Sequence, residues 1–144
     1  MTRIYLDNCC FNRPYDDQSN ILVELETKAK LVIQQMIVDG KLGLVTSYML
    51  EQENDDNPYA ERRNTIMDFF KYAHQDISET QEIIKMAKEA NATGLKVKDS
   101  IHVACAIFAD CEYLLTTDNR FLKYKDARIN VVNPIQFLVE TEGV

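Results

Sequence analysis

Residues 97–118 read VKDSIHVACAIFADCEYLLTTD, and this stretch decides the fold. Its first part, from Val97 to Ala109, is apolar on nearly every side of a helix, which is typical of a helix buried inside a protein. The part from Tyr113 to Thr116 then has the apolar, β-rich character of a short strand that ends just before Asp118. A buried helix followed at once by a strand indicates an α/β protein.

Further strand and helix signals alternate along the rest of the chain. We expect strands at Ile4–Leu6, Leu42–Thr46 and Asn130–Val132. We expect the other helices at residues 21–38, 47–53, 57–74, 79–90 and 134–139. Strands that alternate with helices predict a three-layer α/β/α sandwich with a mostly parallel central sheet.

The helix expected at residues 21–38 has apolar residues at helical spacing and ends before Gly40. We expect one of its faces to be buried, namely the face formed by Leu22, Leu25, Ala29, Val32, Ile33 and Met36. Together with the helices after Pro58, this helix offers more apolar surface than one small core can cover. We therefore expect the protein to form a homodimer.

Length and composition predict a single domain that spans residues 1–144. A chain of 144 residues with 46% hydrophobic residues can bury the core of one ordinary domain, whereas two domains would each be marginal. Only four glycines and three prolines interrupt the chain, and no linker-like or repeated segment separates two parts.

The sequence also predicts where the protein works. No stretch approaches the roughly 18 to 20 apolar residues that span a bilayer, and Met1 to Tyr5 lacks the apolar segment of a signal peptide. We therefore expect a cytoplasmic protein without a membrane partner. Cys9 and Cys10 are adjacent and Cys105 lies in an apolar run, so the spacing indicates reduced thiols, neither a disulfide framework nor a zinc site.

The net charge of −7 and the pI near 4.8 argue against a broad basic face that neutralises the phosphates of a nucleic acid. This objection loses its force if the acids gather in a pocket. A bound Mg²⁺ or Mn²⁺ ion would then invert the local charge and itself contact a phosphate.

Three acidic residues stand where the chemistry of an open α/β sheet is usually found, which is beyond the carboxyl ends of the strands, and a fourth joins them. Asp7 ends the first strand, Asp118 follows the strand expected at Tyr113–Thr116, and Glu53 lies on the short helix that leaves the second strand. Asp99 occupies the first turn of the buried helix. A lone Asp in such a place is usually a turn or cap residue, but four that converge would repel one another without a cation.

The choice between Glu51 and Glu53 rests on helical phase. Met49 and Leu50 should face the core, and Glu53 follows them on the same side of the helix, whereas Glu51 does not. We therefore favour Glu53 as the residue that faces inward. An acidic turn exposed to solvent remains the alternative interpretation of residues 51–56.

The acids stand in an ordered set of motifs: Asp7 in YLDNCCFNRPYDD, Glu53 in SYMLEQENDDNPYAERR, Asp99 in LKVKDSIHVACA and Asp118 in LLTTDNRF. In order and in nearly full-length coverage, the set resembles the acidic motifs of the PIN-domain nucleases. It is similar in particular to the toxin ribonucleases of bacterial VapBC-type toxin–antitoxin pairs. The chain departs from the commonest pattern in having Asn8 and Cys9 where a small hydroxyl residue often follows the first Asp.

This resemblance implies a PIN-like fold and a metal-dependent endoribonuclease. The catalytic and metal-binding residues would be Asp7, Glu53, Asp99 and Asp118, which would hold one or two Mg²⁺ or Mn²⁺ ions. The substrate would be RNA, and an antitoxin protein is the partner that the resemblance suggests. An idle PIN-like module that binds RNA or a protein is the alternative, because a fold does not guarantee its usual activity.

Other polar residues receive simpler interpretations. His102 lies three residues after Asp99 and could act as a general base, but we favour a core histidine or one that supports a ligand through a hydrogen bond. Among the basic residues, Arg13, Lys98 and Arg120 are the best candidates for RNA contacts, because each is close in sequence to a proposed metal ligand.

Overall fold

The computed structural model describes residues 1–143 and contains a five-stranded sheet in the order β3-β2-β1-β4-β5, with every neighbouring pair parallel. The strands are β1 (Thr2–Leu6), β2 (Leu42–Ser47), β3 (Gln75–Ile77), β4 (Tyr113–Leu115) and β5 (Asn130–Val132). The central strand β1 buries its last three residues completely, as expected for a parallel sheet covered on both faces.

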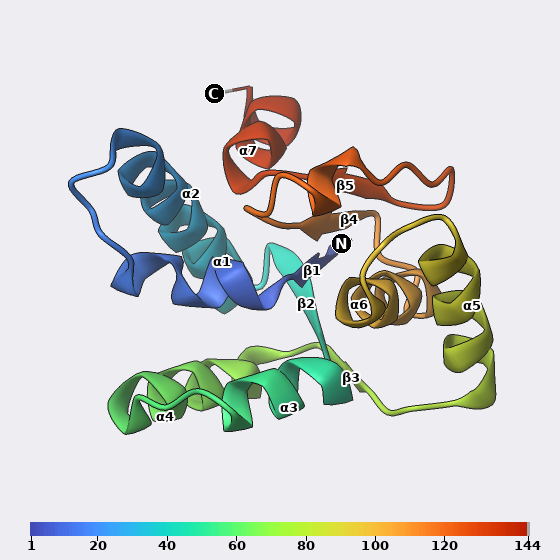
Figure 1. Cartoon of the computed structure of the whole chain (residues 1–144). Coiled ribbons are helices and arrows are strands. Elements are labelled where there is room, and N and C mark those ends of the chain that lie inside the picture. The colour runs from blue at the N-terminus through green and yellow to red at the C-terminus, as the bar shows by residue number, and fades with distance from the viewer. Residues whose placement is uncertain (144) are drawn as a thin grey trace.

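Helices cover both faces of this sheet, which confirms the predicted α/β/α architecture (Figure 1). Helices α2 and α7 pack together on one face, and α5 and α6 pack together on the other. The helices are α1 (Asn8–Asn12), α2 (Ile21–Val38), α3 (Tyr48–Asp55), α4 (Ala60–Phe69), α5 (Gln81–Ala92), α6 (Val97–Phe108) and α7 (Pro134–Glu142). Short 3₁₀ turns occupy Arg13–Tyr15 (η1), Phe70–Tyr72 (η2) and Phe121–Lys123 (η3). None of the helices in residues 1–143 has the length and apolar character needed to cross a membrane.

Helix α6 is largely buried, as its sequence predicts. Its interior residues are Ser100, His102, Val103, Ala104, Cys105 and Ala106. The helix ends at Phe108, and Asp110, two residues later, has a φ of 58° in the left-handed region that Asp tolerates better than most residues. Strand β4 begins three residues after Asp110, so the sequence from Val97 onward forms first a helix that covers the sheet and then a strand of the sheet.

The segment after Asn57 differs from its prediction. We expected a helix from Asn57 towards His74, but α4 begins at Ala60, and the chain turns at Asn57, whose side chain accepts a hydrogen bond from the Tyr59 amide (3.1 Å). The helix ends at Phe69, and the following residues form η2 and the edge strand β3, which was not predicted. Gln75 and Asp76 are exposed, so this short edge strand lacks the apolar alternation by which strands are recognised.

The predicted buried face of α2 is partly wrong. Ala29 and Ile33 are buried as expected, but Leu22, Leu25 and Val32 are about half-exposed. The buried face consists of Glu26, Thr27, Ala29, Lys30, Ile33 and Ile37. The helix is therefore rotated from the orientation that its apolar residues alone favour, because two charged side chains find partners inside the protein.

Candidate metal centre

The ends of β1 and β4 bring the first and last predicted acids together. These strands are parallel neighbours with Leu6 opposite Leu115, and the backbone amide of Asp7 donates a hydrogen bond to the Leu115 carbonyl (2.9 Å). Asp7 follows β1 directly, and Asp118 follows β4 after a two-residue turn. Their proximity is thus a direct consequence of strand pairing.

Asp7 is buried and held in a fixed orientation. One carboxylate oxygen accepts from the Asn8 amide (2.8 Å) and so caps helix α1. The other oxygen accepts from the Thr116 hydroxyl (2.8 Å) and the Cys9 thiol (3.3 Å). Cys9 therefore supplies a hydrogen-bond donor just after the first Asp, where the family that the sequence resembles often has a small hydroxyl residue.

Helix α3 carries Glu53 to the same place. Ser47 is the last residue of β2 and caps α3, because its hydroxyl accepts from the Leu50 amide (3.3 Å). Glu53 then lines the cleft at the end of β1, whereas Glu51 faces Asp76 of β3. Burial and then the neighbouring Asp76 raise the pKa of Glu51. Helical phase thus indicated the correct one of the two glutamates for the cleft.

Helix α6 adds Asp99 and His102, which lie three residues apart on one face. The pKa of Asp99 is raised to about 6, mainly by burial and next by the negative charge of Asp7. Asp118 raises it further, whereas His102 lowers it. Asp99 therefore lies within electrostatic reach of the acids that come from both strand ends.

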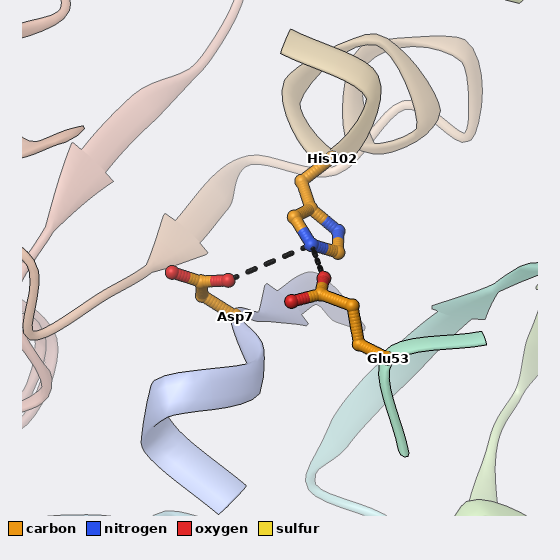
Figure 2. Close-up of side chains that lie close together, drawn as sticks. All are labelled: Asp7, Glu53 and His102. Carbon is orange, nitrogen blue, oxygen red and sulfur yellow. Dashed lines mark hydrogen bonds and ion pairs between the residues drawn. The ribbon is translucent and has the colours of Figure 1, made fainter. Parts of the chain in front are cut away.

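All of the acids predicted from the sequence line one cleft of about 440 Å³. The cleft is lined by Asp7, Asn8, Cys9, Asn12, Asp16, Glu53, Asp99 and Asp118. On its buried side, donor atoms of Asp7, Glu53 and His102 all lie within 4.8 Å of one another (Figure 2). This is the spacing of side chains that can share a single cation.

No family model and no curated protein matches this chain. Among solved structures, it is similar to a chain in the crystal structure of VapBC2 from Rickettsia felis bound to a DNA fragment from their promoter. The TM-score is 0.59 at 12% identity, and the match covers 92% of this chain and 98% of that one. It is also similar to a chain in the crystal structure of DNA-bound VapBC from Salmonella typhimurium, with a TM-score of 0.59 at 11% identity over 93% and 99% of the two chains. The chain has a VapC-like PIN fold.

Within this PIN fold, two residues of the cleft were not recognised from the sequence. Asn12 and Asp16 belong to the segment after Asp7, where we predicted no helix. The short helix α1 places Asn8 and Asn12 one turn apart, and the side-chain amide of Asn12 donates to the backbone carbonyl of Asn8 (3.1 Å). The signal that could have identified α1 is Asp7 itself, because an Asp after a strand is a strong helix cap.

The predicted basic residues differ in their positions relative to this cleft. Arg13 forms ion pairs with Asp16 (2.9 Å) and with Glu26 (3.1 Å), so it serves the fold. The backbone amide of Arg120 donates to Asp118 (2.9 Å), and Arg120 lines a different cavity of about 600 Å³. Lys98 is exposed.

The donor set of the PIN-fold cleft suits a divalent cation. Carboxylate oxygens are the ligands that Mg²⁺ and Mn²⁺ prefer, and several carboxylates in one cleft repel one another unless a cation neutralises them. Such an ion would lower the pKa of a bound water and stabilise negative charge on a phosphate. The residues present therefore fit the ion that the fold implies.

Proposed function

We propose that this protein is a cytoplasmic, metal-dependent endoribonuclease that hydrolyses RNA phosphodiester bonds. Asp7, Glu53, Asp99 and Asp118 would hold Mg²⁺ or Mn²⁺ and form the catalytic centre. The observation that carries the proposal is the convergence of these acids from separate elements on one open cleft. A protein without a use for a cation would gain stability by separating them.

The side chains of the cleft have different roles in this reaction. A divalent ion held by these acids would supply an activated water and charge stabilisation for in-line attack on the phosphorus. Asp7 is held by Thr116 and by its own helix cap, so its oxygens are oriented before any ligand binds. Thr116 also accepts a hydrogen bond from the Asp118 amide (3.1 Å), and one hydroxyl thus positions both acids. Asp99 and Asp118 are only half-buried and line the open cleft, where a substrate would bind.

A basic cavity that includes Arg120, two residues after Asp118, offers a way for an acidic protein to bind RNA. Arg120, Lys123 and Lys125 line this cavity of about 600 Å³ together with Glu89, whereas Arg128 is paired with Asp126 (2.9 Å). Three cationic side chains that follow Asp118 in the chain suit the phosphates that flank a scissile bond. The positive charge needed for RNA is thus local, and the net charge of −7 does not exclude it.

Incubation of the purified protein with a mixed RNA pool, with Mg²⁺, Mn²⁺ or chelator, tests the activity directly. We expect cleavage with either ion, none with chelator, and a loss of cleavage in Asp7→Asn. Asp39→Asn, which changes an exposed Asp at the end of α2, is the matched control and should cleave normally. An inactive wild-type protein that still binds RNA would favour the alternative of an idle PIN-like module.

The basic cavity has its own test. Lys123→Gln and Lys125→Gln should each weaken RNA binding and lower the slope of log affinity against log salt by about 0.7 to 1. Lys41→Gln changes an exposed residue immediately before β2 and should leave both the affinity and the salt dependence unchanged. Equal effects of all three substitutions would mean that RNA binds elsewhere.

We further propose that the protein is the toxin of a toxin–antitoxin pair. The likeness to chains in VapBC complexes supports this, and so does an apolar groove of about 370 Å³. Residues that line this groove include Phe11, Tyr15, Leu31, Phe69 and Tyr72.

Coexpression with the protein encoded by the adjacent gene should yield a complex that no longer cleaves RNA. Leu31→Glu should weaken the complex, whereas Gln35→Glu, also exposed on α2, should not.

A homodimer is the assembly that we propose for the free protein. Ile21, Leu22, Leu25 and Val32 leave an exposed apolar stripe along α2, and Val139 exposes further apolar surface on α7. Such a stripe suits a second copy of the same surface. Light scattering should give twice the mass of the chain, and Leu25→Glu should give a monomer. A wild-type protein that stays monomeric at high concentration would contradict the proposal.

A further inference from the structure

His102 is the one residue of the donor cluster that is not an acid, and it lies within the Asp99 motif. It is only 1% exposed, and its Nε2 atom contacts the carboxylate of Glu53 and lies 3.7 Å from Oδ1 of Asp7. Figure 2 shows the imidazole pointing from α6 towards both carboxylates. A buried ring nitrogen is therefore aimed at the place where the two acids converge.

The other ring nitrogen is held by a buried chain of hydroxyl groups. Nδ1 of His102 lies 2.6 Å from the Tyr5 hydroxyl, which lies 2.6 Å from the Ser47 hydroxyl. Burial keeps Tyr5 protonated, because it raises the pKa of the phenol well above its usual value. When Nδ1 carries the imidazole proton, it donates to Tyr5 and Tyr5 donates to Ser47. The lone pair of Nε2 then faces Asp7 and Glu53.

We propose that Asp7, Glu53 and His102 form a mixed oxygen and nitrogen centre that selects Mn²⁺ over Mg²⁺. This inference rests on the proposed function and specifies the ion of that same site. Mg²⁺ strongly prefers oxygen ligands, whereas imidazole nitrogen is a good ligand for first-row transition metals. A ligating histidine also needs a partner for its second nitrogen, and Tyr5 is that partner.

The donor atoms are close enough to share one ion. An octahedral ion with ligands at about 2.1 Å places neighbouring donors about 3 Å apart and opposite donors about 4.2 Å apart. Nε2 of His102 lies 3.7 Å from Oδ1 of Asp7, between these two values, and all three donor atoms lie within 4.8 Å of one another. Nε2 and Glu53 are in hydrogen-bond contact, so these two groups would have to move apart slightly to bind the same ion. Asp99 and Asp118 stay available on the open side of the cleft for a second ion or for the water.

A simpler role for His102 makes a different prediction. If Nε2 carries the proton, the ring donates to Glu53 and only positions that carboxylate. The ion would then have oxygen ligands alone, and the protein would show no direct bond between nitrogen and metal. A spectrum that reports nitrogen coordination therefore separates the two roles.

The sharpest experiment uses Mn²⁺ alone as the probe and pulsed electron paramagnetic resonance as the readout. The chain has two histidines, and the other one, His74, is exposed. In untagged, chelator-treated His74→Gln protein, His102 is the only histidine. The fold should be preserved, because the substituted side chain is exposed. We expect a ¹⁴N coupling to bound Mn²⁺ in the wild-type protein and in His74→Gln. Bound Mn²⁺ without this coupling in His74→Gln would overturn the proposal.

Metal titrations provide the second measurement. His102→Asn should weaken Mn²⁺ binding about 10- to 100-fold and change Mg²⁺ binding much less. Tyr5→Phe should keep the ¹⁴N coupling but weaken Mn²⁺ binding by a smaller factor, since it removes the oxygen partner of Nδ1. The proposed selectivity would also be overturned if His102→Asn lost the same factor of affinity for Mn²⁺ and for Mg²⁺ while it kept the wild-type circular dichroism spectrum.

The result for this centre can be distinguished from the result for the nuclease. If Mn²⁺ shows nitrogen coordination and no RNA is cut, the metal centre stands and the ribonuclease proposal fails. If RNA is cut and the bound Mn²⁺ shows no nitrogen coupling, the ribonuclease proposal stands and the role of His102 as a ligand fails.

Discussion

Helix α2 and the cleft at the ends of β1 and β4 both bury charged side chains, but the surroundings of these charges differ. On α2, Glu26 is paired with Arg13 at 3.1 Å and accepts a hydrogen bond from Asn133. In the cleft, Asp99 faces the negative charges of Asp7 and Asp118. Charges with compensating partners hold the fold together, whereas like charges in one place leave a site that a cation can complete.

Lys30 is an intermediate case on the same helix. It is buried, its Nζ atom lies over the rings of Phe11 and Phe69 at 5.7 and 5.6 Å, and it donates to Gln34 (2.5 Å). Burial lowers the pKa of Lys30 to about 8. Aromatic rings and an amide thus compensate this charge only in part.

The largest effect that we predict is on the cleft. Asp99→Asn should lower RNA cleavage about 100-fold or more, because it removes a negative charge that helps to hold the ion, and with it water activation and charge stabilisation. It should leave the metal-free protein equally or slightly more stable, because one of several mutually repelling acids is neutralised. Cleavage assays and thermal melts on the same sample measure both effects.

A control for this prediction lies at the other end of the same helix. Asp110→Asn makes the same chemical change just beyond the end of α6, and Asn also tolerates its φ of 58°. It should leave RNA cleavage unchanged. Normal cleavage by Asp99→Asn with normal stability would exclude Asp99 from the catalytic residues.

The opposite outcome is expected for the compensated charge. Glu26→Gln should destabilise the protein by about 2 kcal/mol, because it leaves Arg13 without its buried partner. The full cost of a broken buried pair is reduced here, since the Arg13 side chain is 22% exposed. Glu24→Gln is the matched control on α2, where an exposed pair with Lys28 contributes only about 0.5 kcal/mol or less.

Urea denaturation of both variants at pH 7 measures this difference. If Glu26→Gln costs no more than Glu24→Gln, the pair with Arg13 does not hold α2, and the contrast between the two regions would be lost.

The same contrast explains what could be read from the sequence. Asp7 and Asp118 follow strands and Glu53 lies on the short helix after β2, so the rule for strand ends predicted that these three converge. Asp99 was predicted from its place in the first turn of the buried helix and from the order of the acidic motifs. The strands β1, β2, β4 and β5 were likewise found from their apolar runs. These features depend on periodicity and chain order, which a single sequence contains.

The features that were missed depend on contacts between distant segments. Glu26 accepts a hydrogen bond from Asn133, which is 107 residues away in the sequence, and His102 is hydrogen-bonded to Glu53, which is 49 residues away. No local pattern signals either contact. Periodicity therefore favoured the apolar side of α2 as the buried one. His102 is a core residue that hydrogen-bonds to another residue, as predicted, but the sequence did not identify Glu53 as its partner. The edge strand β3 was missed for a related reason, because its pairing with β2, and not its composition, makes it a strand.

The last prediction concerns Lys30 and tests whether a partly compensated charge costs stability. Lys30→Met should stabilise the protein by about 1 kcal/mol at pH 7, because a buried ammonium is replaced by an apolar side chain of similar length, less the cation–π attraction that is lost. The pKa of Lys30 is about 8 in the folded protein and near 10.5 in the unfolded one. Between these values the unfolded chain binds the proton that the folded protein has released, so the wild-type protein gains stability as the pH rises. The advantage of Lys30→Met should therefore be largest below pH 8 and shrink towards pH 10.

Lys28→Met, exposed on the same helix, should show neither effect. Urea denaturation of the three proteins at pH 7, 8, 9 and 10 measures this, and an advantage independent of pH would show that packing, and not the charge, governs the stability at this position.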